Sequence, residues 1–388
     1  MGIYKIYPSK DATLYSEYPS MNTGLDEIIE ASTYLKDDQG QSCRYLIQFS
    51  QDEINNVFDT HISKSGIFTR SYNVYLKNYA AVVTNLNQST TLEILPVSCS
   101  WDMGTGRYLN SPETQIGCSW KWRDESGSVA WITSGFEPLS KGYSVSGKEG
   151  GGTWWTGSTT QLDITSSQVF TYSNPIDVEQ DVTNITSIWI SQSKGITGGD
   201  ITNDGFLIKQ INSNEFIPSE SKAATLKYYS VDTNTIYPPH LEFRFDDYSW
   251  DTGSSTNTIL SAAESFISVY NNAGTYYSQS VARLRLAARP KYPTRTFATS
   301  SIYTTNYYLP ISSSYAIKDS ETNEYIIDFD KKYTQISADA NSSYFDVYMN
   351  GLEPERYYTI LIKTELDNTT KVFDENITFK VINGWQKK

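Results

Sequence analysis

Residues 241–245 read Leu241-Glu242-Phe243-Arg244-Phe245, and their strict alternation of apolar and charged side chains decides the fold. Successive side chains of a β-strand point to opposite faces, so three of these would face a core and two would face water. The same period recurs at 282–286 and 344–349. Further strands are expected at 3–7, 27–34, 43–49, 72–79, 91–97, 325–329, 357–363 and 377–382. The sequence therefore predicts an all-β protein.

Helical spacing is scarce along the chain. Only 51–58 and 182–192 place apolar residues on one face over two or three turns, the latter with Asp181 or Thr183 as N-cap. We therefore expect less than about 15% helix, well below the usual third.

The length of 388 residues is enough for two or three domains that each bury a core. The clearest boundary follows Phe245, where 246–257 is small and polar and has no periodicity. We expect a first β-sandwich at 1–247, a linker at 248–259 and a second β-sandwich at 260–388. Weak periodicity and six tryptophans mark 100–175 as long loops that elaborate one end of the first sandwich.

Charge and composition argue against several partners. Lys and Arg number 31 against 44 Asp and Glu, and the net charge of -13 would repel a nucleic-acid backbone. There is no run of about 18 apolar residues, so no membrane contact is expected. The start of the chain does not resemble a secretory signal, which predicts folding in a cytoplasm. Cys43, Cys99 and Cys118 lack the paired spacing of zinc or redox motifs and are expected to be buried thiols.

The first half of the chain carries an ordered set of short motifs. These begin with 10–15 (KDATLY), 22–24 (NTG) and 43–49 (CRYLIQF), which resemble the start of DNRLRE-type β-sandwich modules. Later landmarks follow in that family's order, namely 104–106, 152–154, 181–183 with Trp189, 203–208 and 239–243. The resemblance spans about residues 10–245 and implies a jelly-roll fold of the carbohydrate-binding type. It indicates the fold more firmly than a ligand.

The second half resembles another family. The strings 288–297 (ARPKYPTRTF) and 352–358 (LEPERYY), with 379–381 (FKV), are similar to a structural-protein family of large contractile-tailed phages. This resemblance implies a component of the virion, in the neck, tail, baseplate or fibre-attachment region. The tight connection at 351–354 before a strand is also typical of fibronectin-like or Ig-like sandwiches.

Two loops have the outline of ligand sites without their key residues. The segment 142–148 has the glycine and lysine spacing of a phosphate-binding loop, but Glu149 stands where the magnesium-binding hydroxyl belongs. The segment 200–205 (DITNDG) offers oxygen ligands for calcium but lacks the spacing and distal glutamate of an EF-hand. We expect a flexible loop and an Asx-rich turn, and we predict neither a metal nor a cofactor.

Catalytic groups are also scarce. The chain has only two histidines, His61 and His240, and neither lies near a nucleophile motif, so both are expected at the surface or in packing. The acid pairs Asp37-Asp38 and Asp246-Asp247 could in principle hydrolyse glycosides, but adjacent residues point in different directions. The sequence therefore predicts no enzyme and no catalytic residue.

Aromatic residues are the remaining signal, with 30 Tyr, 9 Trp and 15 Phe. Exposed indoles anchor protein interfaces or stack on sugars, whereas buried ones fill a core, and the sequence leaves all three roles open. We expect an assembly interface at two segments, 100–155 and 303–315. Its predicted residues are Trp101, Trp120, Trp122, Trp131, Trp154, Trp155, Tyr303, Tyr307, Tyr308 and Tyr315.

Together these features predict a non-enzymatic structural protein of a tailed-phage virion that acts by permanent contact with other virion proteins, as a homo-oligomer or in association with a ring. It would be made and assembled in the cytoplasm of the bacterial host. The alternative is a glycan-binding adhesion module, and a glycan-degrading enzyme is a distant third.

Overall fold

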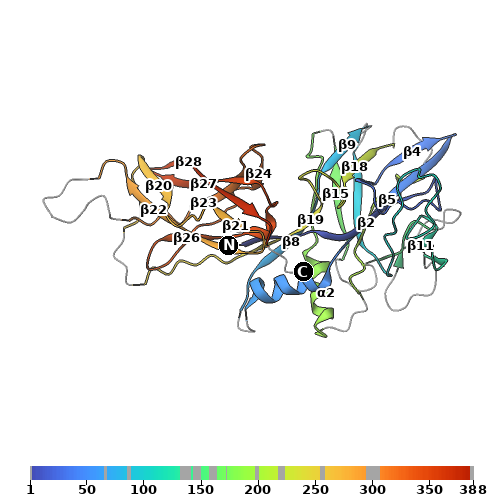
Figure 1. Ribbon diagram of the computed structural model, residues 1–388, viewed down its shortest axis with the longest axis horizontal. Helices are drawn as coiled ribbons and strands as arrows, with labels where there is room; N and C mark the ends of the chain where they lie inside the picture. The colour runs from blue at the N-terminus through green and yellow to red at the C-terminus, as the bar shows by residue number, and fades with distance from the viewer. Residues whose placement is uncertain are drawn as a thin grey trace. The chain divides into compact units, whose positions relative to one another are not determined.

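The computed structural model describes residues 2–64, 68–84, 89–131, 141–142, 150–156, 164–171, 173–196, 201–216, 223–253, 258–293 and 306–384. Strands predominate in the structure (Figure 1). They make up 46% of the described residues, and helices make up 8%. The all-β prediction and the low helix content are therefore confirmed.

The chain divides into two compact units. The C-terminal unit comprises Met1–Lys5, His61–Tyr72 and Phe243–Lys388, and the N-terminal unit comprises Ile6–Thr60 and Asn73–Glu242. The chain passes between the units four times, within β1 (Gly2–Ile6), after Thr60, after Tyr72 and within β19 (His240–Phe245). The division near residue 242 lies close to the one expected at 247, but two early segments belong to the C-terminal unit. The periodicity of a short segment does not show which distant part of the chain the segment packs against.

A six-stranded sheet forms the centre of the N-terminal unit. Its order is β15-β10-β17-β5-β2, with β4 also paired to β5, and the neighbouring strands are antiparallel. The strands are β15 (Ser166–Phe170), β10 (Thr90–Pro96), β17 (Phe206–Gln210), β5 (Gln39–Phe49), β2 (Pro8–Tyr15) and β4 (Thr33–Lys36).

Apolar layers cover both faces of this sheet. On one face, Leu14, Leu46 and Leu207 belong to a buried cluster with tryptophans of the 97–155 region. On the other face, the Phe206 ring lies 4.8 Å from that of Trp189, in a helix. Strand β5 serves both layers because successive side chains alternate, and it is almost continuously buried. The described tryptophans of the region expected to form long loops are therefore part of a core layer.

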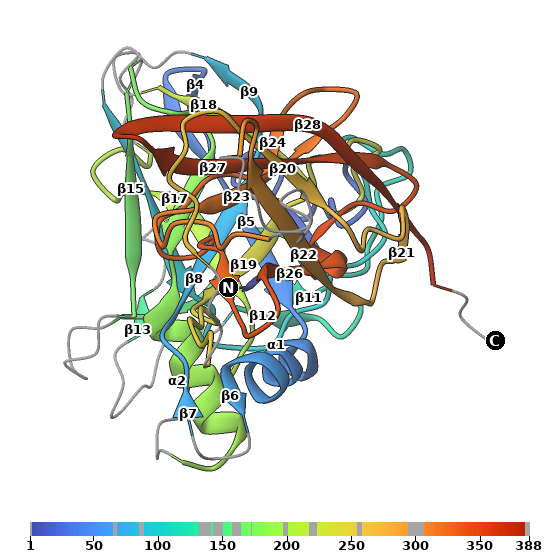
Figure 2. The same cartoon turned by 90° about the vertical axis from the view of Figure 1, so that its left-hand side faces the viewer.

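Smaller elements complete the N-terminal unit. A three-stranded sheet has the order β3-β18-β9, and three further pairs join β8 to β16, β11 to β12 and β13 to β14. Helices α1 (Gln51–Val57) and α2 (Thr183–Ser193) lie side by side (Figure 2). The strands are β3 (Ile28–Glu30), β18 (Thr225–Tyr229), β9 (Ala80–Thr84), β8 (Tyr72–Asn78), β16 (Val178–Asp181), β11 (Trp122–Asp124), β12 (Val129–Ala130), β13 (Lys141–Gly142) and β14 (Trp154–Trp155).

The C-terminal unit is a β-sandwich of two sheets. The first has the order β20-β22-β26-β25 and the second β21-β28-β27-β23-β24, in which only the β21–β28 pair is parallel. The strands are β20 (Ser265–Val269), β22 (Val281–Pro290), β26 (Ser343–Tyr348), β25 (Ser337–Ala338), β21 (Thr275–Tyr277), β28 (Thr369–Ile382), β27 (Tyr357–Leu366), β23 (Ser314–Asp319) and β24 (Tyr325–Ile327). The unit also contains the short pair β6 (Ser63–Lys64) and β7 (Phe68–Thr69).

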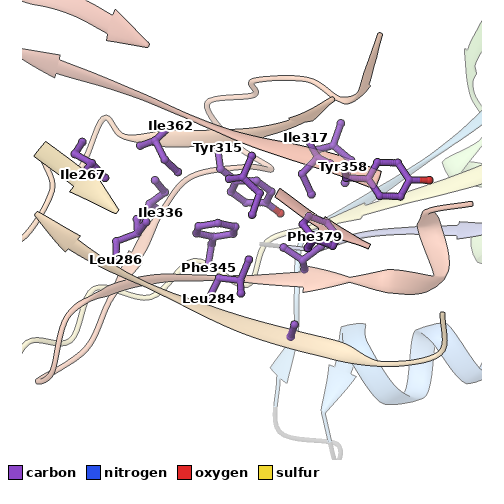
Figure 3. Packing of buried hydrophobic residues seen from close by; sticks show 14 of the residues in the cluster. Ile267, Leu284, Leu286, Tyr315, Ile317, Ile336, Phe345, Tyr358, Ile362 and Phe379 are labelled. Atoms are coloured by element: carbon purple, nitrogen blue, oxygen red, sulfur yellow. The ribbon is translucent and has the colours of Figure 1, made fainter. Parts of the chain in front are cut away.

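The core of the sandwich lies between these two sheets (Figure 3). Leu284, Leu286 and Phe345 come from the first sheet, and Tyr315 and Tyr358 come from the second. The rings of Tyr315 and Phe345 stack with their centroids 4.3 Å apart. The apolar residues of the alternating segment 282–286 therefore face this core, as the sequence predicts.

A tyrosine corner precedes β27. The Tyr358 hydroxyl donates a 2.8 Å hydrogen bond to the Glu353 carbonyl, five residues upstream. Immunoglobulin-like sandwiches use the same local device, a tyrosine near a strand start that bonds back to the preceding connection. This contact gives the 351–354 connection a defined path into the strand.

The segment expected to be a linker is attached to the C-terminal unit. Within its described residues, 248–253 and 258–259, the Asp251 N–H donates to the Ala338 carbonyl at 3.0 Å. The Trp250 ring lies 6.0 Å from that of Tyr308, whose N–H donates to the Thr258 carbonyl at 3.0 Å. The linker prediction is wrong for these residues, because composition alone does not reveal pairing at a sheet edge.

Candidate interaction surfaces

Most of the predicted interface tryptophans fill the core of the N-terminal unit. Five of them, Trp101, Trp120, Trp131, Trp154 and Trp155, are between 3% and 7% exposed. All but Trp155 belong to the cluster that covers one face of the central sheet, and the burial of all five closes them to a neighbouring subunit. The interface prediction is wrong for these five, because the described residues around them pack within the N-terminal unit itself. Trp122 is half-buried in β11, beneath the Lys121 amine at 4.6 Å.

The predicted interface tyrosines behave in the same way. Tyr308 and Tyr315 are 2% and 1% exposed, and Tyr307 is half-buried against the sandwich core. Burial raises the pKa of Tyr315, as expected for a hydroxyl closed to solvent. The interface prediction is therefore wrong for Tyr308 and Tyr315. Tyr303 lies outside the described residues.

The tryptophan layer encloses a buried ion pair. Arg44 on β5 donates through Nε and Nη2 to the two carboxylate oxygens of Glu215, each at 2.8 Å. Its guanidinium lies 4.8 Å from the Trp120 ring and donates to the Gly151 carbonyl at 2.7 Å. Burial opposes ionisation, yet Arg44 and then Lys209 hold the pKa of Glu215 below its usual value. Arg44, from the 43–49 motif that resembles the DNRLRE-type modules, therefore has a structural role inside the N-terminal unit.

The other family-like motifs also hold loops together. The Asn22 side chain donates to the carbonyls of Met103 and Cys118, each at 2.7 Å, and accepts from the Gly106 N–H at 2.7 Å. The Thr13 N–H donates to the Thr23 hydroxyl at 3.0 Å, and that hydroxyl donates to the Thr13 carbonyl at 2.7 Å. The motifs at 10–24 and 104–106 therefore correspond to two neighbouring sets of hydrogen bonds that hold these loops in place.

The two histidines pack among aromatic rings. His61 lies 4.9 Å from Tyr348 and 5.8 Å from Phe245, stacked on the latter. His240 is buried, with its ring 5.8 Å from that of Tyr79 and its Nε2 3.8 Å from the Glu242 carboxylate. Both positions match the packing role that we expect from the sequence.

The two loops with the spacing of ligand sites, 142–148 and 200–205, are only partly within the described residues. In 201–205, the Asn203 side chain donates to the Phe49 carbonyl at 3.0 Å and accepts from the Gly205 N–H at 3.2 Å, as in an Asx turn. Asp200 and most of 142–149 lie outside the described residues. Within the described ranges, no group of three or more His, Cys, Asp or Glu is arranged to hold a metal. Asp37 and Asp38 form the turn between β4 and β5, both with positive φ.

Exposed aromatic residues gather on the C-terminal unit instead. Among the described residues, seven aromatic side chains are strongly exposed, and all but Tyr108 belong to this unit. They are Phe266, Tyr270, Tyr277, Tyr292, Tyr325 and Tyr357. Exposed aromatic groups of this size are unfavourable in water and are enriched at protein interfaces.

The outer face of the first sheet combines two of these aromatic residues with arginines. Strand β22 alternates buried apolar residues with Arg283, Arg285 and Arg289. Its neighbour β20 contributes Phe266, and Tyr270 follows directly after β20. We name these five residues, together with Tyr344, the arginine–aromatic face. The sequence shows the alternation, but the exposure of β20 was missed because its five residues are too few for a clear period.

Ion pairs and ring contacts order this face. Arg283 donates hydrogen bonds through Nε and Nη2 to the Asp346 carboxylate, each at 2.9 Å. Arg285 donates through Nη1 and Nη2 to the Asp339 carboxylate at 3.0 and 2.7 Å. The guanidiniums of Arg283 and Arg285 lie 4.1 and 5.7 Å from the Tyr344 ring. The bond from Arg285 lowers the pKa of Asp339 to about 2. The face is therefore preorganised, since its long side chains are already held in place.

A second candidate surface is a groove in the N-terminal unit. It has a volume of about 350 Å³ and lies between β15, β16 and the start of α2. Ile94, Ile164 and Phe206 form its buried apolar part. Amide, hydroxyl and carboxylate groups supply the rest, from Asn73, Thr165, Ser166, Gln180, Asp181, Thr183 and Asn184. Asp181 is fixed there by the Thr183 N–H at 2.8 Å.

Comparison with models of known protein families and with characterised proteins finds no match for the sequence. No helix in the described ranges is long and apolar enough to cross a membrane.

Proposed function

We propose that the protein is a non-enzymatic structural component of a tailed-bacteriophage virion, in the neck, tail, baseplate or fibre-attachment region. It acts by protein–protein contact with other virion proteins and is assembled in the host cytoplasm. The observation that carries this proposal is the arginine–aromatic face, because Arg and Tyr dominate the binding energy of protein interfaces. The phage-like strings at 288–297 and 352–358 support the viral setting.

The structural roles of the motif residues add support. Arg44, Asn22 and both histidines are engaged in packing or buried hydrogen bonds. Groups fixed in this way stabilise a scaffold, and the proposed function requires stable units with a presented surface.

Mass spectrometry of purified particles of the phage that encodes the chain tests the proposal. We expect the protein at a stoichiometric copy number, and we expect a reconstruction of the particle to place the arginine–aromatic face against another subunit. Absence of the chain from extensively washed particles would contradict the proposal.

The groove favours a second candidate function, glycan binding. Its mixture of buried apolar residues with amide, hydroxyl and carboxylate groups is the kind of lining that holds a polar ligand of few rings. Titration with host surface oligosaccharides, followed by NMR, would perturb residues of the groove in this case. The exposed Asn184→Ala variant should then weaken binding, while the exposed Asn110→Ala variant, outside the groove, should not.

A further inference from the structure

Charge is distributed very unevenly between the two units. The N-terminal unit contains 13 Lys and Arg against 27 Asp and Glu, which gives a net charge of -14. The C-terminal unit contains 18 Lys and Arg against 17 Asp and Glu, which gives +1. The excess negative charge of the whole chain therefore belongs to one unit.

The arginine–aromatic face lies on the unit without excess negative charge. Almost half of the Arg283 side chain is exposed, at 48%, although it is paired with Asp346. Arg289 lies with its guanidinium 5.0 Å from the exposed Phe266 ring. Lys291, at the end of the same strand, has a 44% exposed side chain and lies 3.7 Å from Glu264. Among the described residues of this region, Arg283, Arg285 and Lys291 lie beside Asp346, Asp339 and Glu264 respectively, and Arg289 adds a fourth cation.

Electrostatics distinguishes the possible contacts between two copies of the chain. Two N-terminal units would bring together surfaces with a net charge of -14 each, and like charges in contact are costly. Two arginine–aromatic faces would bring together the same four cations and three carboxylates from each copy, so neither side would supply unpaired negative charge to the other. The remaining arrangement, the arginine–aromatic face of one copy against the acidic N-terminal unit of another, joins opposite charges. At physiological salt, charges are largely screened from one another beyond about 8 Å. The charges close to each contact therefore decide which of these arrangements is favoured.

We propose that the arginine–aromatic face binds the acidic N-terminal unit of a second copy of the chain. This inference rests on the proposed function and names the partner of that assembly. A contact between two different surfaces repeats from copy to copy and closes into a ring or continues as a filament. Phe266 and Tyr270 would supply the apolar contact area, and the arginines would supply charge-assisted bonds to carboxylates.

Isotope-mixed cross-linking of the full chain tests this proposal. Equal amounts of ¹⁴N- and ¹⁵N-labelled protein are mixed, and a carbodiimide then joins Lys291 to carboxylates in contact with it. Links between light and heavy peptides come only from different copies. We expect mixed links from Lys291 to Asp and Glu within 6–60 and 73–242, together with concentration-dependent association in sedimentation velocity.

Variants give the test its specificity. Phe266→Ser with Arg289→Glu should abolish the mixed links and weaken association at least about tenfold, whereas Tyr357→Ala, an equally exposed aromatic on the other sheet, should leave both unchanged. If the double variant does not fold, Tyr270→Ala alone should weaken association. A monomer at 100 μM, or mixed links that persist in the variants, would overturn the inference. The proposed function would still stand if the chain were found in particles.

Discussion

Arg44 and Glu215 form a two-pronged ion pair whose side chains are 1% and 4% exposed, enclosed between the central sheet and the tryptophan layer. Lys209 lies 3.5 Å from the same carboxylate and 3.0 Å from Glu93, so the pair belongs to a buried network of alternating charge. A buried charge is tolerated only when such partners replace the water that it has lost.

Arg44→Met should destabilise the N-terminal unit by about 3 to 5 kcal/mol, because it leaves Glu215 buried without its main partner. Urea unfolding followed by tryptophan fluorescence measures this, since seven of the nine tryptophans lie in the N-terminal unit. Lys194→Met, which breaks a solvent-exposed pair with Asp59 in the same unit, is the control and should cost less than about 1 kcal/mol. Equal effects of the two substitutions would contradict the assigned role of Arg44.

Asn22→Ala should cost about 2 to 4 kcal/mol, because the buried carbonyls of Met103 and Cys118 and the Gly106 N–H all lose a partner. The loss should appear in the same fluorescence transition. Asn110→Ala, in an exposed turn, should change stability by less than about 0.5 kcal/mol. An Asn22→Ala protein of unchanged stability would show that the motif does not hold these loops together.

Gly152→Ala should unfold or strongly destabilise the N-terminal unit. A Cβ atom at this position would lie 2.2 Å from Leu207 Cδ1, and its φ of +95° is unfavourable for any side chain. Gly195→Ala is a useful control for φ alone, because its φ of +67° is also positive but no atom lies within 4 Å of the added carbon. We expect soluble yield and the unfolding midpoint to fall much more for Gly152→Ala. Comparable losses would mean that backbone conformation, and not the contact with Leu207, sets the requirement for glycine.

Alternation predicted the strands because it is a local property of the chain. Leu284 and Leu286 face the core and Arg283 and Arg285 face outward, as their spacing requires. Burial of the tryptophans was not predictable in this way, since Trp101 and Trp120 reach the central sheet from segments outside any strand, where the sequence has no period. The same limit applies to residues 1–5 and 61–72, whose membership in the C-terminal unit depends on contacts with residues far along the chain.

The candidate surfaces depended even more on tertiary structure. Arg283 and Arg285 are visible in the sequence as the polar half of a strand, but Phe266 joins them only because β20 pairs with β22. The groove gathers residues from 73 to 206, and no single motif contains them. Composition shows that the chain is rich in aromatic residues, but it does not show which of them are exposed.

Asn368→Gly should stabilise the C-terminal unit by about 0.5 to 1 kcal/mol. Asp367 and Asn368 form the two-residue turn between β27 and β28, with φ of 51° and 57°. Such turns favour glycine at the second position, where it adopts positive φ without strain. Thermal unfolding followed by circular dichroism measures the change. Asn341→Gly, where no positive φ is required, should not stabilise, and stabilisation by both variants would indicate a nonspecific effect.

Asp11 makes the stability of the N-terminal unit depend on pH. Burial, with a smaller contribution from the negative charges of Asp232 and Asp26, raises the pKa of this carboxyl to about 8, although the Val231 N–H opposes the shift with a 2.7 Å bond. The folded protein therefore keeps the proton up to about pH 8, whereas the unfolded chain loses it near pH 4. Stability from this group is greatest below about pH 4 and falls as the pH rises toward 8.

Asp11→Asn removes this titration while keeping an oxygen to accept from Val231. Relative to the variant, the original protein should lose roughly 1 kcal/mol of unfolding free energy for each pH unit between 5 and 7. Urea unfolding at pH 5, 6 and 7 measures the difference, and Asp38→Asn, in an exposed turn with positive φ, serves as the control. Parallel stability curves for the original protein and Asp11→Asn would mean that the buried carboxyl is already ionised at pH 5. Its raised pKa would then be refuted, because an ionised Asp11 adds no proton uptake on folding in this range.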